Sequence, residues 1–333
     1  MPGLGTLADA PMVARVVHAA TGADPNDLRI AGQGQTSVGW YVEAPGGPYS
    51  VLVEIPADAR HERYRDKPTN YAARHAILEA LVAHEVPSMA PIATTATLDR
   101  ADPTGGRWDW MVSGWGAGTP AGGTISDEAA RDFGRYLAAL HALPTEGYGR
   151  LENRADTLRG VATDRHEGLM SRWWPDPWPF DGRALLSHPI VHAAHVLVTT
   201  IATLRGGLLR FEDDRMQVSV CHTDLNGAHI LVDDDGRLAS VIDFGDAAIL
   251  PPAFDIASFA FFFGWDSVDP LLDGYTTNGV FQDIRRTEAH QLAVVLALQK
   301  IEKHITEVPD EAKVASTITF LERTLPLAVR RIA

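Results

Sequence analysis

The segment CHTDLNGAHILVDDDGRLASVIDFGDA (residues 221–247) gathers a dense group of side chains whose types and spacing could do chemistry. It contains His222, Asp224, His229 and Asp243. A carboxylate on a loop can accept a proton from a hydroxyl group, and a second carboxylate with a neighbouring ligand can hold a divalent cation. Phosphoryl transfer needs these groups, because its catalysis consists mostly of positioning and charge neutralisation.

The elements around this segment indicate how these residues meet. The sequence predicts strands over 218–221, 229–232 and 238–242, with a turn at 233–236. Antiparallel pairing about the turn places His229 opposite a residue close to 242, so Asp243 returns beside His229, and the preceding loop holds Asp224 at the same end. The alternative is a loop whose aspartates make only turns and caps, and the spacing favours the reactive site.

The rest of the chain predicts an α+β protein in two lobes, because 333 residues exceed the usual size of one hydrophobic core. Strands are expected over 38–43, 49–55, 92–98 and 108–113, and helices over 12–20, 71–84, 126–143, 191–204, 288–306 and 313–332. The glycine-rich segment 114–124 has the composition of a loose hinge. The N-lobe is therefore expected over 1–113 and the C-lobe over 114–333.

Four stretches of the sequence together resemble one known family. They are HTDLNGAHILVD (222–233), VIDFGDA (241–247), PAFDIA (252–257) and LAALHALPTEGYGRL (137–151). They resemble the aminoglycoside phosphotransferase family, which includes macrolide and other antibiotic kinases. The resemblance implies a protein-kinase-like fold, with a small strand-rich N-lobe that matches only in layout and a larger, mostly helical C-lobe.

The resemblance also implies a role for each matching residue. Asp224 looks like the catalytic base that orients and deprotonates the acceptor hydroxyl, and His222 looks like the residue that braces the catalytic loop. Asp243 looks like the main metal-binding carboxylate, and Asp255 looks like a structural residue buried beneath the loop. Asp246 is expected at the edge of the acceptor pocket, where it meets a positive group on the substrate or serves only as a capping carboxylate.

His229 stands where most of the family has asparagine, and macrolide phosphotransferases are similar to this sequence there. An imidazole can ligate a divalent metal, although Mg²⁺ prefers oxygen, and the alternative is a histidine that only forms hydrogen bonds. A ligating histidine must be neutral, so metal-dependent activity is predicted to fall as the pH drops through an ordinary histidine pKa of about 6.5. The expected cofactors are Mg²⁺ or Mn²⁺ with ATP or GTP.

A second departure from the family lies in the predicted strand 49–55, where Glu54 occupies the position that usually holds lysine or arginine. Arg74 lies near the position of the usual helix glutamate. The ion pair is therefore predicted to be reversed, with Arg74 contacting the nucleotide phosphates and Glu54 orienting it. This departure leaves open a non-catalytic, kinase-like binding protein, which the presence of Asp224 and Asp243 disfavours.

The turn GQGQTS (32–37) has two glycines, but a serine replaces the third glycine of a complete phosphate-binding motif. Such a motif alone is weak, and the alternative is a plain polar turn. The expected phosphate contacts are Gly34, Gln35, Thr36 and Ser37. The expected adenine contacts are the backbone groups of Met111, Ser113 and Trp115.

The predicted reaction transfers the γ-phosphate of ATP or GTP to a hydroxyl of an antibiotic, in a pocket that includes 259–269 and the C-terminal helices. The net charge of −14 and the acidic residues Asp246, Asp266 and Asp269 favour a cationic acceptor, such as an aminoglycoside or a basic cyclic peptide. For the net charge taken alone, solubility is the favoured explanation. The aromatic run and His229 favour a macrolide instead. A metabolic kinase for a sugar or amino alcohol and a two-metal hydrolase are the remaining alternatives.

Composition narrows the partners to a nucleotide and a small-molecule acceptor. The acidic charge argues against nucleic acid, and no apolar run is long enough for a signal peptide or a membrane span.

The single cysteine, Cys221, forms no intrachain disulfide and favours a cytoplasmic setting. Only four residues are lysine, none of them between 68 and 299, which excludes a mechanism that needs a buried lysine there. A monomer or homodimer is expected.

Overall fold

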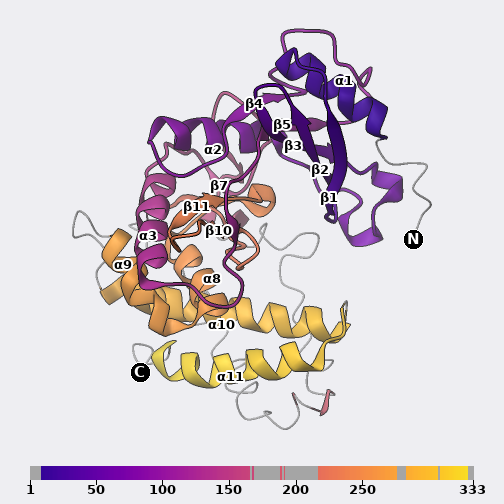
Figure 1. Ribbon diagram of the computed structural model, residues 1–333. Coiled ribbons are helices and arrows are strands. Elements are labelled where there is room, and N and C mark those ends of the chain that lie inside the picture. Colours follow the sequence, from indigo (N-terminus) through magenta and orange to yellow (C-terminus); the bar gives the residue numbers. More distant parts are fainter. Residues whose placement is uncertain are drawn as a thin grey trace.

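The computed structural model describes residues 9–165, 167–168, 188–189, 191, 217–275, 283–306 and 308–328. The N-terminal part is rich in strands and the C-terminal part is mostly helical, as Figure 1 shows. The predicted two-lobed, kinase-like α+β fold is therefore confirmed. The helix predicted over 191–204 lies outside the described residues apart from Val191.

The N-terminal part is built on a five-stranded antiparallel sheet. Its strand order is β1 (Asp27–Gln33), β2 (Ser37–Ala44), β3 (Gly47–Glu54), β5 (Trp110–Gly114) and β4 (Pro91–Thr94). Four of these strands were predicted. Strand β1 was missed because it is an edge strand with mostly exposed side chains, so its sequence carries no alternation of apolar and polar residues.

The two faces of this sheet are covered by different parts of the chain (Figure 1). Helix α1 (Ala10–Thr21) buries Val13 and Val16 in one cluster with Trp40 and Val51. Helix α2 (Tyr71–Ala83) packs with Met111 of β5 in the core that continues into the C-terminal part. Because side chains alternate along a strand, the second face also presents Ser50 and Leu52 toward the cavity described below.

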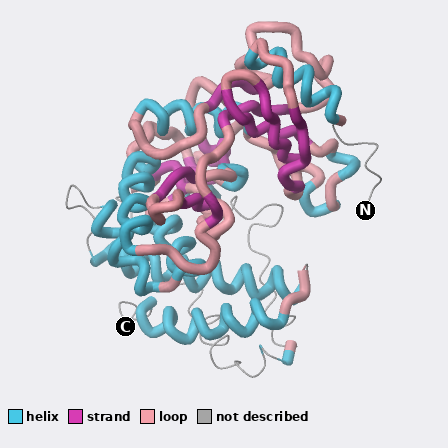
Figure 2. Tube along the Cα trace, in the orientation of Figure 1, coloured by secondary structure: helices cyan, strands magenta, loops and turns pink. Residues whose placement is uncertain are grey.

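The C-terminal part consists of helices packed on two small sheets (Figure 2). The helices are α3 (Asp127–His141), α8 (Ala253–Phe263), α9 (Val268–Tyr275), α10 (Asp283–Thr306) and α11 (Glu311–Ala328). Ser126 caps α3 as predicted, since its hydroxyl accepts from Ala129 N. Helix α8 is buried over most of its length, so Phe254 and Phe259 belong to the core. Within the described residues, no helix has the length and apolarity to cross a membrane.

The hairpin that carries the predicted chemistry is formed by β10 (Ile230–Val232) and β11 (Leu238–Val241). Ile230 pairs with Val241, and Ile242 N donates to His229 O at 2.9 Å, which confirms the predicted register. Strand β9 (Ser219–Cys221) leads into the catalytic loop and pairs with β12 (Ala248–Leu250). The latter also pairs with β7 (Tyr148–Leu151), whose other neighbour is β8 (Gly160–Ala162).

The predicted looseness of segment 114–124 is wrong. Its residues Thr119–Pro120 form strand β6, which pairs with β10. Gly118, with φ of 93°, lies so close to this hairpin that a Cβ atom would approach Val232 O to 2.6 Å. Gly118 therefore permits close packing of the connection against the hairpin.

Candidate active site

A cavity of about 710 Å³ lies between the five-stranded sheet, the catalytic loop and α10. Its volume lies within the usual range of small-molecule sites. Ten of the predicted site residues line it: Gly34, Gln35, Thr36, Ser37, Arg74, Trp115, Asp224, His229, Asp243 and Asp246. Six predicted residues do not line it: His222, Glu54, Met111, Ser113, Asp266 and Asp269.

The catalytic loop that follows β9 is anchored by a buried carboxylate. Asp255, near the start of α8, accepts hydrogen bonds from His222 N and Thr223 N, both at 2.8 Å. His141 at the end of α3 contacts the same carboxylate through Nε2 at 3.1 Å and Tyr275 through Nδ1 at 2.8 Å. These contacts confirm that Asp255 is a structural residue beneath the loop.

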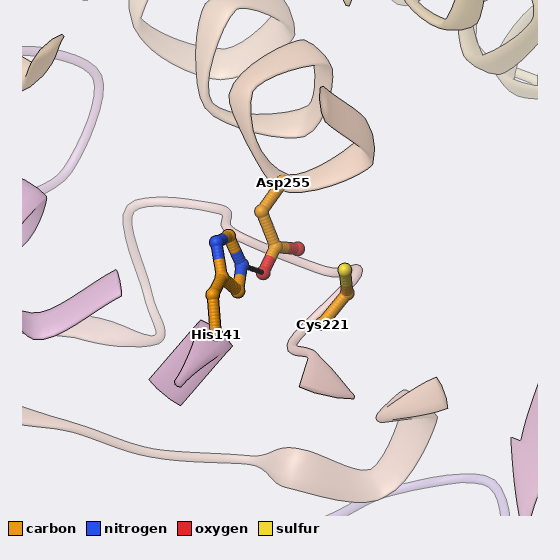
Figure 3. Close-up of side chains that lie close together, drawn as sticks. All are labelled: His141, Cys221 and Asp255. Carbon is orange, nitrogen blue, oxygen red and sulfur yellow. Dashed lines mark hydrogen bonds and ion pairs between the residues drawn. The ribbon is translucent and has the colours of Figure 1, made fainter. Parts of the chain in front are cut away.

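His141, Cys221 and Asp255 lie close enough together to suggest a metal site, as Figure 3 shows. The chemistry of the three groups argues against one. Burial raises the pKa of the Cys221 thiol well above its usual value, and the thiol contacts Leu250 O at 3.4 Å. A neutral thiol is a poor ligand, and the Asp255 oxygens already accept backbone hydrogen bonds. The cluster therefore braces the loop.

His222 holds the loop from within and does not contact the cavity. Its ring is fully buried, and Nε2 donates to Ile242 O at 2.9 Å. Burial is the main cause that lowers the pKa of His222 below its usual value, so the ring is neutral. His222 is therefore a positioning residue that ties the catalytic loop to the strand leading to Asp243.

Asp224 and His229 meet at the floor of the cavity. The His229 ring lies beside Asp224: Nδ1 is 2.8 Å from the Asp224 carbonyl oxygen, which is a hydrogen bond, and 3.8 Å from Oδ2 of the side chain, which is too long for one. A carbonyl oxygen can only accept, so Nδ1 carries the proton in the neutral ring. The lone pair of Nε2 then points toward Asp243, whose Oδ2 is 3.5 Å away.

The facing lone pairs of His229 and Asp243 fit a divalent cation. Mg²⁺ lies about 2.1 Å from each ligand, so two ligands of one ion are at most about 4.2 Å apart. Asp243 has φ of 63°, a strained conformation for a residue with a side chain, and its Oδ1 accepts from Gly245 N at 3.2 Å. Asn226, which the sequence analysis missed, also lines the cavity, and its Nδ2 lies 3.4 Å from His229 Nε2.

The glycine-rich turn between β1 and β2 forms the opposite wall. Gly34 N donates to Ser37 O at 2.9 Å, which closes the turn. The Ser37 hydroxyl accepts from Tyr71 at 2.7 Å, so the turn is tied to the start of α2. Gly34, Gln35 and Thr36 all border the cavity, in the place where backbone and hydroxyl donors could meet an anionic ligand.

The predicted pairing of Glu54 with Arg74 is wrong, because Glu54 pairs with Arg60. The loop after β3 folds back and buries the Arg60 guanidinium, which also donates to Ile55 O at 2.6 Å and to Lys67 O at 2.5 Å. Asp109 N donates to the other Glu54 oxygen at 3.3 Å. Glu54 thus has its own buried cation and does not border the cavity.

Arg74 borders the cavity and does not pair with Glu54. Its side chain is 6% exposed and its Nε atom has no hydrogen-bond partner within the described parts of the chain. A side chain at Gly245 would approach Arg74 Nη2 to within 2.7 Å, so the guanidinium lies against the turn that follows Asp243. A guanidinium that borders the cavity beside this turn is suited to an anionic ligand.

Of the predicted adenine contacts, only Trp115 borders the cavity. Met111 and Ser113 lie in β5, where β3 and β4 occupy the backbone groups on both sides, so they do not border the cavity. Trp115 follows the strand and does border it, together with Gly116. Apolar side chains that also line this side are Leu52, Met89, Leu231 and Ile242.

The acidic residues predicted to bind the acceptor divide into two groups. Asp246 borders the cavity, and its Oδ1 accepts from Lys67 Nζ at 2.6 Å. Asp266 is exposed at the end of α8, and Asp269 on α9 pairs with Arg286 at 2.8 Å. Neither Asp266 nor Asp269 lines the cavity, because α8 ends at Phe263 and the chain continues into α9.

Helix α10, one of the C-terminal helices predicted to contribute to the acceptor pocket, supplies one wall of the cavity. Its lining residues are Leu296, Gln299, Lys300, Glu302 and Lys303. Lys300 Nζ lies 3.8 Å from Asp224 Oδ1. The sequence analysis missed this lysine, as well as Lys67 and Arg150, as site residues. The rarity of lysine was the available signal, since three of the four lysines of the chain line this one cavity.

Comparisons with solved structures support the fold. A thermostable mutant of aminoglycoside phosphotransferase APH(4)-Ia, in ternary complex with AMP-PNP and hygromycin B, is 13% identical with a TM-score of 0.64; the match covers 96% of this chain and 99% of that chain. Spectinomycin phosphotransferase APH(9)-Ia in complex with ADP and spectinomycin is 12% identical with a TM-score of 0.59, over 97% and 98% of the two chains. Macrolide 2'-phosphotransferase MphH from Brachybacterium faecium is 17% identical with a TM-score of 0.54, over 92% and 97%.

Sequence comparison identifies the family. A search of the curated proteins finds no match to this chain. A family model described as the phosphotransferase enzyme family matches residues 27–290, which include the glycine-rich turn, the catalytic loop and Asp243. The matched range is most of the 333 residues and contains the cavity apart from the end of α10. The chain is therefore a phosphotransferase and belongs to the phosphotransferase enzyme family.

Proposed function

We propose that this enzyme transfers the γ-phosphate of ATP or GTP to a hydroxyl group of a small molecule. The observation that carries the proposal is the position of Asp224, whose carboxylate borders the same cavity as the glycine-rich turn and the His229–Asp243 pair. This arrangement provides a base for the acceptor beside groups suited to a metal and to phosphate. Positioning and charge neutralisation are what phosphoryl transfer requires.

The nucleotide is proposed to lie against the N-terminal sheet. Leu52, Met89 and Ile242 offer apolar surfaces for a purine ring, next to the backbone of Trp115 and Gly116. The turn from Gly34 to Ser37 then meets the phosphates, and Arg74 takes the place of the strand lysine that this chain lacks. The position of the Arg74 guanidinium supports this role, because the side chain borders the cavity and lies against the turn that follows Asp243.

The acceptor hydroxyl is proposed to bind at Asp224. Asp224 takes the hydroxyl proton while the hydroxyl oxygen forms a bond to the γ-phosphorus. The bond from that phosphorus to the oxygen bridging the β- and γ-phosphates breaks, and the nucleoside diphosphate leaves with the electron pair. A divalent cation, Mg²⁺ or Mn²⁺, held by Asp243 and His229 would neutralise charge on the phosphates. Lys67 lies at the same end of the cavity through its bond to Asp246.

Antibiotics are proposed as the first acceptors to test, because the relatives include structures bound to hygromycin B and spectinomycin. The sequence-based preference for a cationic antibiotic loses two of its three acidic residues, since Asp266 and Asp269 lie away from the cavity. The third, Asp246, is paired with Lys67. A polycation therefore has less support than a neutral or acidic acceptor.

The test is phosphate transfer from γ-labelled ATP and GTP to a panel of antibiotics, sugars and hydroxy acids. Asp224→Asn should lower kcat by about 10²–10⁴-fold, because it removes the base while keeping the shape of the side chain. Thermal stabilisation by AMP-PNP with Mg²⁺ should persist in this variant. Absence of stabilisation of the unaltered enzyme by any nucleotide would contradict the proposal.

A further inference from the structure

Lysine is distributed unusually in this chain. Only four of its 29 lysine and arginine residues are lysine, and Lys67, Lys300 and Lys303 all line the cavity. The fourth, Lys313, is exposed on α11 and pairs with Asp310 at 3.6 Å. Lysine places a compact charge with three donors at the end of a long side chain, so it can meet an anionic group at many angles. The clustering is best explained by a ligand rather than by surface charge.

The two oxygens of the Asp224 carboxylate face different surroundings. Oδ2 faces His229, which leads to Asp243 and the side of the cavity suited to the metal and the phosphates. Oδ1 faces Lys300, whose Nζ is 3.8 Å away. Since the phosphates are proposed to lie on the His229 side, the acceptor occupies the Lys300 side. Lys300 therefore lies next to the acceptor rather than next to the nucleotide.

Lys300 is held in place without using up its hydrogen-bonding capacity. Its side chain is 24% exposed, and Nζ lies 5.4 Å from the centre of the Phe262 ring. The separation of 3.8 Å from Asp224 Oδ1 is within ion-pair range but too long for a hydrogen bond. An anionic group of a ligand could therefore accept hydrogen bonds from Lys300 while Asp224 remains beside its hydroxyl.

The charges of the described cavity residues fit such a ligand. The acidic side chains are Asp224, Asp243, Asp246 and Glu302, and the basic ones are Lys67, Arg74, Arg150, Lys300 and Lys303. Asp224 is the proposed base, Asp243 is a proposed metal ligand, and Asp246 is bonded to Lys67. Glu302 is the remaining acid on the α10 wall, where two lysines accompany it. This wall thus carries more positive than negative charge.

We propose that the acceptor carries an anionic group, a carboxylate or a phosphate, that binds Lys300 and Lys303 next to the hydroxyl that Asp224 deprotonates. This inference rests on the proposed phosphotransfer to a hydroxyl group. A carboxylate or phosphate forms charge-assisted hydrogen bonds with lysine ammonium groups, which are stronger than neutral ones. The substrate class is therefore hydroxy acids or phosphorylated alcohols, and polycations are excluded from the same position by Lys300 and Lys303.

The first test compares matched acceptors with the full chain, γ-labelled ATP and GTP, and Mg²⁺. The panel pairs gluconate with glucose, other hydroxy acids with their amides, and sugar phosphates with the free sugars, and it includes hygromycin B as a polycation. Anionic members are expected to have kcat/KM at least about tenfold above their neutral partners, a difference typical of one charge-assisted hydrogen bond. The inference is overturned if no anionic member is phosphorylated, or if a neutral or cationic member is the better substrate.

The second test locates the anion with variants, using the best anionic acceptor. Lys300→Gln should raise the KM of that acceptor about tenfold and leave the KM of the nucleotide unchanged, while Lys300→Arg should retain most of the affinity. Lys313→Gln is the matched control and should change neither constant. An increase in the nucleotide KM alone would overturn the inference. AMP-PNP stabilisation of the same samples separates this failure from failure of the proposed function, which predicts nucleotide binding in every variant.

Discussion

The catalytic loop and the basic wall of the cavity, formed by Lys67, Lys300 and Lys303, are held in place in different ways. The loop is anchored by short, fully buried groups: Asp255 is 0% exposed and accepts two backbone hydrogen bonds at 2.8 Å. The wall presents long side chains that reach the cavity from partly exposed positions. Lys67 and Lys300 are 16% and 24% exposed, and each contacts an aspartate of the cavity.

This difference separates positioning from charge neutralisation. A buried, satisfied network is costly to disturb, so the geometry at Asp224 is fixed before any ligand arrives. Ion pairs at partly exposed sites contribute little to stability, and their lysines can exchange partners when an anionic ligand enters. Changes in the loop should therefore alter folding, and changes in the wall should alter ligand affinity. Each of the following variants is a way to contradict or refine this separation.

The largest effect is expected at Asp255. Asp255→Ala leaves the N–H groups of His222 and Thr223 without their buried acceptor and removes the carboxylate that contacts His141 Nε2. The free energy of unfolding should fall by about 3–5 kcal/mol, measured by urea denaturation. Asp266→Ala, at an exposed position just beyond the same helix, should change it by less than about 0.5 kcal/mol. Equal effects of the two variants would show that the carboxylate does not anchor the loop.

His229 is expected to affect the metal more than the fold. His229→Asn replaces a nitrogen ligand by an amide oxygen, and imidazole favours the later transition metals relative to Mg²⁺. The ratio of Mn²⁺ affinity to Mg²⁺ affinity should fall about tenfold, followed by the electron paramagnetic resonance signal of Mn²⁺ in the presence of AMP-PNP. Asp243→Asn should instead weaken both metals. An unchanged ratio in His229→Asn would mean that the ring serves only as a hydrogen-bonding group.

Arg74 should affect nucleotide affinity with little change in stability. Arg74→Gln removes the guanidinium whose Nε is buried without a partner, so no existing hydrogen bond from that atom is lost. The Kd for AMP-PNP should rise about tenfold, measured by calorimetry. Glu54→Gln is the informative comparison, because Glu54 pairs with Arg60 and does not border the cavity. A larger loss of affinity in Glu54→Gln than in Arg74→Gln would restore the original pairing as a functional link.

The parts of the site that the sequence predicted correctly depend on local pairing. The hairpin register follows from the turn at 233–236, so the approach of Asp243 to His229 could be predicted from spacing. The glycine-rich turn at Gly34 was also predicted, although the strand that precedes it, β1, was missed. Where the chemistry is built within one hairpin, residue types and turn positions determine which side chains meet.

The parts that were not predicted depend on packing between distant segments. Lys300 reaches Asp224 across 76 positions of the chain because α10 packs on α8, and no periodicity in either helix specifies that contact. Glu54 was assigned to Arg74 by analogy with related chains, but the loop after β3 supplies Arg60 from only six positions away. The acidic residues at the end of α8 carried the right charge for a cationic ligand, but the direction of that helix takes them away from the cavity.

The smallest expected effect is the dependence of stability on pH. Burial lowers the pKa of His222 below the ordinary value of about 6.5, so the folded state keeps the ring neutral where the unfolded state binds a proton. Stability from this group is fully present above that ordinary pKa and declines as the pH falls below it toward the lower folded value. His75 is half-buried with a pKa lowered in the same direction, so it adds to the same trend.

Between pH 7.5 and pH 5.5 the unfolding free energy should fall by on the order of 1 kcal/mol, measured by urea denaturation at several pH values. His222→Asn should be less stable at neutral pH and should show a flatter profile than the unaltered enzyme. If the profile stays steep in His222→Asn, another group takes up the proton. His222 would then not be the residue that makes the stability of the catalytic loop depend on pH.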